Sequence, residues 1–149
     1  MHKTISFNTK FGWITVEEKN KQILSIKFKK LHNKGKSNQL QKIKKNIKDF
    51  LFNKTKTFNP KIVLNGTKLE IKIWKELTKI PYGKTKSYGE IAKKVKTSPR
   101  YVGNVCAKNK HLLVIPCHRV IRSDGTLGGF SAPQGINLKR KLLKLEQLI

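Results

Sequence analysis

The sequence predicts an α+β fold, and three observations predict it. Near the N-terminus, apolar and polar residues alternate at the two-residue period of strands. From Ser37 onward the apolar residues recur at steps of three and four, which is typical of an amphipathic helix. After Asn65–Gly66, helix caps follow one another at short intervals. We therefore expect a small N-terminal sheet domain with one helix, residues 1–65, and then a mainly helical domain, residues 66–149.

The N-terminal domain is expected to begin with three short strands at residues 4–7, 13–18 and 22–28. Asn20–Lys21 is a plausible hairpin turn between the second and third strands. A basic loop precedes Ser37, and Lys61–Leu64 is expected to add a further strand. The helix after Ser37 should bury Leu40, Ile43, Ile47, Phe50 and Leu51.

Serine and threonine caps position the helices of the second domain. Thr67 with Glu70, and Ser87 with Glu90, have the spacing of capping boxes. Ser98 caps a third helix, with Pro99 at the favoured first position. The second and third of these helices, joined by a short turn, form a helix-turn-helix pattern. The inward residues are expected to be Ile71, Trp74 and Leu77, then Ile91 and Val95, then Val102, Val105 and Cys106, and finally, in a helix from about Asn137, Leu138, Leu142, Leu145 and Leu148 or Ile149.

The formal charge of +26 at pH 7 points to a polyanionic partner, with nucleic acid first. Residues 1–65 hold 16 Lys and Arg against three acids, and residues 66–149 hold 18 against five, so each part carries +13. Solvated lysines on every face explain this even distribution equally well. Arginine is more selective: only four arginines occur beside 30 lysines, all in the second part, and arginine offers a planar fork that lysine lacks.

The composition also excludes several classes of protein. No segment approaches the ~20 apolar residues of a membrane span, and the N-terminus lacks the apolar core of a signal peptide. Two cysteines provide no disulfide framework and no zinc-type pair, and the histidines show no metal-ligand spacing. We expect a cytoplasmic monomer with free thiols, without a metal or a cofactor.

The segment IPCHRV, residues 115–120, is the strongest chemical signal in the chain. Cys117 lies directly before His118, and a thiol becomes a useful nucleophile when a base or a positive field favours its thiolate. A buried cysteine at a strand end fits this fragment alone about as well. The continuation RSDGTLGGF favours the nucleophile.

Together, IPCHRVIRSDGTLGGF resembles the active-site signature of the O6-alkylguanine-DNA alkyltransferases, which repair DNA in a single turnover. The resemblance extends upstream through GTKLEIKIWKELTKIPYGKTKSYGEIAKKV and RYVGNVCAKN and downstream to LLKLE, so it covers about residues 66–146. It implies a ribonuclease-H-like N-terminal domain and irreversible transfer of an alkyl group from guanine O6 in DNA to Cys117. O4-alkylthymine is a second candidate substrate.

The resemblance also implies the catalytic residues. His118 matches the base that takes the thiol proton, and Glu146 matches the acid that hydrogen-bonds this histidine. Asn109 matches the asparagine that fixes the active-site turn and bonds the histidine side of the relay. On sequence alone, Glu146 is an ordinary helix-surface acid and Asn109 an ordinary helix C-cap.

The DNA side of the resemblance rests on two further residues. The target base lies inside the duplex stack and has to be flipped out. Tyr88 matches the tyrosine that crowds the target phosphate and donates to the departing guanine, and Arg100 matches the arginine that fills the vacated place. Each is otherwise an ordinary residue near a helix start. The presumed DNA face of the third helix, which the resemblance places in the minor groove, also includes Tyr101, Asn104 and Lys108.

The loop that walls the guanine pocket is expected at Gly128, Gly129, Phe130 and Ser131. Two rival functions remain. An alkyltransferase-like protein that binds lesions without repairing them would lack the cysteine, and a helix-turn-helix regulator would have no use for the PCHRV segment. Double-stranded DNA with alkylated guanine is therefore the expected partner.

Overall fold

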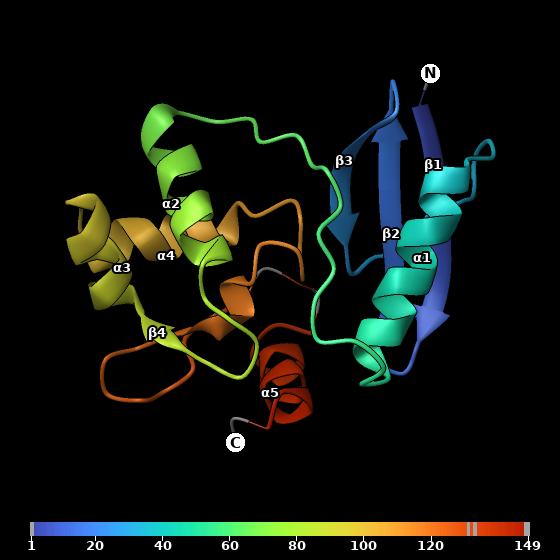
Figure 1. Cartoon of the computed structure of the whole chain (residues 1–149). Coiled ribbons are helices and arrows are strands. Elements are labelled where there is room, and N and C mark those ends of the chain that lie inside the picture. Colours follow the sequence, from blue (N-terminus) through green and yellow to red (C-terminus); the bar gives the residue numbers. More distant parts are fainter. Residues whose placement is uncertain (1, 131, 133, 148–149) are drawn as a thin grey trace. The chain divides into compact units, whose positions relative to one another are not determined.

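The computed structural model describes residues 2–130, 132 and 134–147 (Figure 1). The chain divides into two compact units. One comprises Met1–Val63 with Lys110–Val114, and the other comprises Leu64–Asn109 with Ile115–Ile149. The fold class is α+β, as predicted: a three-stranded sheet with a helix comes first, and a mainly helical part follows.

The first unit is built on an antiparallel sheet with the order β1 (His2–Thr9), β2 (Gly12–Lys19) and β3 (Gln22–Lys27). The predicted hairpin turn is confirmed, because Asn20 and Lys21 both have positive φ, 52° and 63°. In contrast, the strand predicted at Lys61–Leu64 is wrong. That segment makes only one isolated bridge, between Ile62 and Ile23, directly after Pro60, a residue with no N–H to donate.

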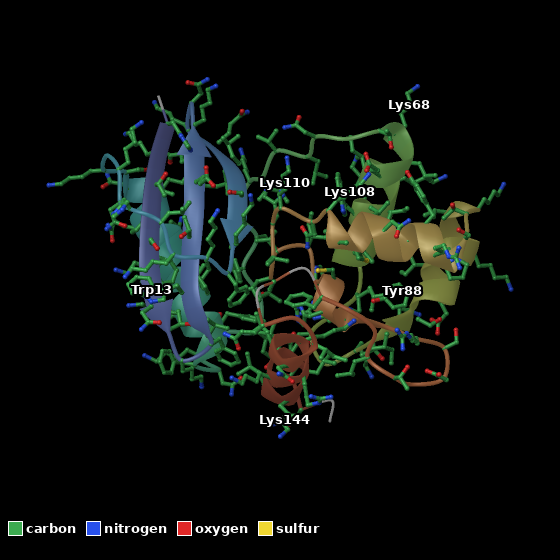
Figure 2. All side chains as sticks on the ribbon, turned by 180° about the vertical axis from the view of Figure 1, so that it is seen from behind. Trp13, Lys68, Tyr88, Lys108, Lys110 and Lys144 are labelled. Atoms are coloured by element: carbon green, nitrogen blue, oxygen red, sulfur yellow. The ribbon has the colours of Figure 1, made fainter. Side chains whose placement is uncertain are left out.

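The core of this unit lies between the sheet and α1 (Asn38–Leu51). The register pairs Ile5 with Val16 and Phe7 with Ile14, so these four buried side chains share one face. Ser37 caps α1 by accepting from the Leu40 N–H, and all five residues predicted to be inward in this helix are buried. In Figure 2 the sheet lies in front of α1, and Trp13 is labelled on it.

The second unit contains the helices that position the candidate site. Its elements are α2 (Lys68–Thr78), β4 (Lys86–Ser87), α3 (Tyr88–Val95), α4 (Pro99–Ala107), the 3-10 turn η1 (Cys117–Arg119), β5 (Val120–Ile121) and α5 (Ile136–Leu145). The pair α3–α4 is the predicted helix-turn-helix: α3 ends at Lys96 in the left-handed region, and Ser98 caps α4. A short parallel pairing of β4 with β5 brings the start of α3 beside the chain that follows η1.

One of the two capping boxes predicted for this unit was wrong in part. The Thr67–Glu70 capping box is fully formed, but the Ser87–Glu90 box is only half formed. Ser87 accepts from the Glu90 N–H, whereas the Glu90 carboxylate lies 3.5 Å from Lys86 Nζ. Lys86 competes for that carboxylate from an adjacent exposed position.

The inward faces mostly agree with the predictions. Trp74 and Leu77 of α2 are buried, and the Trp74 Nε1–H donates to the Val105 carbonyl at 3.3 Å, which ties α2 to α4. Ile71 is only half-buried, and Ile73 takes its place in the core. As predicted, the following residues are buried: Ile91, Val95, Val102, Val105, Cys106, Leu138 and Leu142. In α5, Leu145 is half-buried, and the predicted Leu148 and Ile149 lie outside the described residues.

Within the described part of the chain, none of the helices combines the length and apolar character that crossing a membrane requires.

Candidate active site

Cys117 lies at the start of η1, where the backbone turns tightly after Pro116. Its side chain is buried, with 3% of the residue exposed. The Asn109 amide closes this turn by donating to the Ile115 carbonyl at 2.9 Å and to Cys117 Sγ at 3.2 Å. Asn109 therefore holds both the turn and the sulfur.

The buried setting keeps the sulfur protonated in the resting protein. Burial raises the pKa of the Cys117 thiol to about 11, although the Asn109 hydrogen bond and the nearby Lys139 ammonium oppose the rise. At neutral pH the group is thus a thiol, and any nucleophilic chemistry requires a base nearby.

His118 and Glu146 form a buried pair directly behind the sulfur. The His118 Nε2–H donates to Glu146 Oε2 at 2.6 Å, and both side chains are fully buried. Burial lowers the pKa of His118, only partly opposed by Glu146, so the ring is neutral at physiological pH. Its Nδ1 has no hydrogen-bond partner among the described residues. A neutral ring bonded through Nε2 leaves Nδ1 free to accept a proton.

Arg119 completes this pair from the other side, a role that the sequence interpretation missed. Its Nε–H donates to Glu146 Oε1 at 2.8 Å, and Nη1 donates to the Ile80 carbonyl at 2.8 Å. The Gly83 N–H donates a second hydrogen bond to Glu146 Oε1, at 3.0 Å. Burial alone would raise the pKa of Glu146, but the bonds from His118, Arg119 and Gly83 bring it down to about 2. The carboxylate is therefore ionised and fixed.

Lys139 is the second buried cation that the sequence interpretation missed. It lies on α5 with no exposed surface, and its Nζ donates to the Val120 carbonyl at 2.6 Å. Two longer bonds, each 3.2 Å, reach the Tyr88 hydroxyl and the Gly129 carbonyl. Burial lowers the pKa of Lys139 to about 8, so the ammonium form still predominates at neutral pH.

Of these groups, Cys117 lines a cavity of about 450 Å³ that lies entirely within the second unit. Its walls come from the start of α3, one side of α4, Cys117, and segments 122–123 and 128–130. No carboxylate is among the described lining residues, whereas two arginines are. Two aromatic residues, a glycine loop and a thiol in one cavity suit a flat, neutral heterocycle that carries a reactive carbon.

The predicted residues separate into three groups. Tyr88, Arg100, Gly128, Gly129 and Phe130 line the cavity together with Cys117. The supporting residues Asn109, His118 and Glu146 are buried behind the thiol. The remaining predicted residues are Tyr101, which is half-buried on α4, Asn104, which is exposed on α4, Lys108, which is exposed directly after α4, and Ser131, which lies outside the described residues.

The matching family model is described as the DNA-binding domain of 6-O-methylguanine DNA methyltransferase and spans residues 68–148. The methylated-DNA--protein-cysteine methyltransferase of Sulfolobus acidocaldarius is 37% identical over 142 residues, which cover 94% of this chain and 90% of that protein. The chain belongs to the methylated-DNA--protein-cysteine methyltransferase family. Its activity is accordingly a DNA-repair transfer of the methyl group of O6-methylguanine to one of its own cysteines.

Solved structures agree with this membership. The Mycobacterium tuberculosis O6-methylguanine methyltransferase superposes with a TM-score of 0.87 at 28% identity, covering 99% of this chain and 93% of that one. A structure of the M. tuberculosis protein in complex with DNA gives a TM-score of 0.85 at 27% identity, covering 97% and 92%.

One position in the pocket of this methyltransferase requires glycine for a steric reason. Gly128 has φ +72°, and a Cβ built on it would lie 2.9 Å from the Tyr88 hydroxyl oxygen. Any other residue would therefore be strained in its backbone and would push the tyrosine away. Gly128 thus sets the position of Tyr88 over the cavity.

Across residues 2–130, 132 and 134–147, no three His, Cys, Asp or Glu side chains gather in a group that could hold a metal ion. Both cysteines, Cys106 and Cys117, are free thiols.

Proposed function

We propose that Cys117 is the acceptor of the alkyl group. The observation that carries this assignment is a single cavity with the Cys117 thiol in its wall and the His118–Glu146 pair behind it. In the reaction the Cys117 sulfur forms a bond to the methyl carbon while the bond from that carbon to guanine O6 breaks. The product is a thioether, which water does not cleave, so each molecule reacts once.

The proton of Cys117 passes to His118. Nδ1 of the neutral ring is the accepting nitrogen, and one bridging water carries the proton, since the described residues include no direct bond between Nδ1 and the sulfur. Glu146 stabilises the imidazolium that forms, and Arg119 keeps Glu146 ionised. Asn109 stabilises the thiolate by donating to it.

The departing guanine receives its hydrogen bond from Tyr88. Burial raises the pKa of the Tyr88 hydroxyl to about 12, so the group is protonated and able to donate. Lys139 donates to the same oxygen and supplies positive charge while electron density moves onto the base.

The substrate is double-stranded DNA that contains an O6-alkylated guanine, with O4-alkylthymine as a second candidate. The target base lies inside the duplex stack, so it is flipped out to reach the cavity. Arg100, exposed at the start of α4 and in the cavity wall, fills the vacated place. The rest of that helix, with Tyr101, Asn104 and Lys108, lies against the minor groove. Lys108 also pairs with Glu70 at 3.2 Å, so it is the weakest of these contacts.

We further propose a domain boundary near residue 65, with residues 66–149 as the DNA-binding and transfer domain. A single chain acts without a cofactor.

The test is to mix the protein with an O6-methylguanine duplex and to measure protein mass and peptide masses. We expect one added methyl group, located on Cys117, and a yield that stops at about one equivalent of protein. Cys106→Ala is the matched control and should react normally, whereas Cys117→Ala should bind DNA without gaining mass. A methyl group on Cys106, or continued turnover with excess substrate, would overturn the assignment. Lesion binding without any mass gain in the wild type would favour a binding-only protein.

A further inference from the structure

The four arginines of the chain occupy distinct environments, and one of the two that line the cavity has no role in the proposed reaction. Arg119 is buried on Glu146, Arg140 is exposed on α5 beside Asn137, and Arg100 lies at the start of α4. Arg122 is exposed, follows β5 directly, and lines the cavity with its neighbour Ser123. In a chain of 30 lysines, an arginine in a cavity wall calls for an explanation.

Arg122 projects its charge into the cavity. Its guanidinium opposes the rise in the pKa of the Tyr88 hydroxyl and contributes to the lowered pKa of Lys139, so it lies within electrostatic reach of both groups. Tyr88 lines the cavity, and Lys139 is fully buried and donates to the Tyr88 hydroxyl. Arg122 is therefore placed at the rim, where the cavity meets solvent.

Among the described residues no acid forms an ion pair with Arg122, although Asp124 is near enough for the two charges to interact. None of the salt bridges formed by the described residues includes Arg122. The nearest acid in sequence, Asp124, accepts instead from the Thr126 N–H at 3.0 Å and the Thr126 hydroxyl at 2.7 Å. The rim thus presents a guanidinium, with the Ser123 hydroxyl beside it, to an anion.

We propose that Arg122 binds a phosphate group of the flipped nucleotide at the rim of the cavity. This inference rests on the proposed function. A nucleotide that enters base-first leaves its phosphodiesters outside the cavity, where the exposed guanidinium can donate two parallel hydrogen bonds to phosphate oxygens. Arg122 and Arg100 then divide the work: Arg100 compensates for unstacking, which only a duplex needs, and Arg122 holds the backbone, which every strand has.

Three substrates separate these roles: an O6-methylguanine duplex, the same single strand, and free O6-benzylguanine. Arg122→Gln should slow transfer from both DNA substrates about tenfold, the usual scale of one charged hydrogen-bond pair, and leave the free base unchanged. The loss should lie in DNA affinity, with a smaller salt dependence. Arg122→Lys should recover part of the lost DNA affinity. Arg100→Gln should slow the duplex alone, and Arg140→Gln is the matched surface control.

Each other outcome has one meaning. Equal slowing on all three substrates would show that Arg122 acts on the reaction inside the cavity, and no slowing on either DNA would show that it binds no phosphate; both overturn the inference. A wild-type protein that transfers nothing from DNA would instead overturn the proposed function itself. Circular dichroism of each variant verifies folding, and Arg122→Lys repeats the comparison if Arg122→Gln does not fold.

Discussion

Residues 1–65 and 66–149 carry the same net charge, +13 each, but the two structural units of the chain place their cations differently. In the first unit the cations are lysines on the surface, and several lie over aromatic rings of the same unit: Lys30 Nζ lies 4.6 Å from the centre of the Trp13 ring, and Lys10 Nζ 5.0 Å from that of Phe52. In the second unit, Arg119 and Lys139 are buried against an acid, carbonyls and the active-site tyrosine.

This difference shows that charge count alone says little about function. A solvated lysine costs almost nothing to place, whereas a buried cation is expensive unless its partners are fixed around it. The burial of Arg119 and Lys139 therefore lowers stability in the region that carries the active site, and fixed partners offset this cost. The following experiments test whether the two classes of cation differ as the structure indicates.

The largest effect is expected from Glu146→Gln. The change leaves the buried Arg119 guanidinium without a counter-charge and removes the anion that stabilises a charged His118. We expect the free energy of unfolding to fall by about 3 kcal/mol or more and transfer to slow roughly 100-fold. Urea unfolding and single-turnover kinetics measure both. Glu76→Gln, which breaks only the surface pair with Lys79, should cost under about 0.5 kcal/mol. Similar costs for the two variants would contradict the comparison.

The buried Glu146 carboxylate also predicts that the protein loses stability in acid. The folded pKa of Glu146, about 2, lies below its unfolded value of 4.5, so the unfolded chain binds more protons between these limits. Ionised Glu146 therefore contributes about 3 kcal/mol to the free energy of unfolding. This contribution is present above pH 4.5 and is lost as the pH falls towards 2. The lowered pKa of His118 acts in the same direction below pH 6.5. Denaturant unfolding across this pH range should show that the free energy of unfolding falls more steeply with decreasing pH for wild type than for Glu146→Gln. Equal slopes would refute this prediction.

Much of the fold could be predicted from the sequence because its signals are local. The caps at Thr67 and Ser98 and the apolar stripe of α1 act within a few residues, and each formed as predicted. The prediction of a complete Ser87–Glu90 capping box failed because a nearby lysine, Lys86, competes for the Glu90 carboxylate. The prediction of a strand at Lys61–Leu64 failed because strand pairing depends on a partner that is distant in the sequence.

The candidate site was less predictable for the same reason. The PCHRV motif and the family resemblance brought Cys117, His118 and Glu146 together, but nothing local reveals that Arg119 meets Glu146. Lys139 could have been suspected, since it lies three and seven residues before Leu142 and Glu146 and so shares their inward face. A lysine is ordinarily assumed to be solvated, and its buried partners come from three other segments.

Replacing the buried lysine tests its contribution directly. Lys139→Met keeps the volume of the side chain but removes the ammonium beside Cys117 and the donor to Tyr88. The pKa of the Cys117 thiol should rise beyond about 11, and transfer should slow about tenfold, equivalent to about 1.4 kcal/mol. The pH dependence of iodoacetamide labelling reports the thiol. Lys42→Met, on the exposed side of α1, is the control and should change neither quantity. A normal rate in Lys139→Met would mean that the buried charge is only structural.

The smallest effect on stability is expected from the contact between a surface lysine, Lys30, and the aromatic ring of Trp13. Lys30 lies over Trp13, which is 37% exposed, and an exposed contact of this kind contributes about 0.5 kcal/mol. A double-mutant cycle of Lys30→Gln and Trp13→Ala should give that coupling in unfolding free energy, and Lys36→Gln paired with Trp13→Ala should give none. Transfer to Cys117 should be unchanged in every variant, because these residues belong to the unit without the cavity. A slower transfer reaction in Lys30→Gln would show that the N-terminal cations also serve the substrate, and the division of labour between the two units would then be wrong.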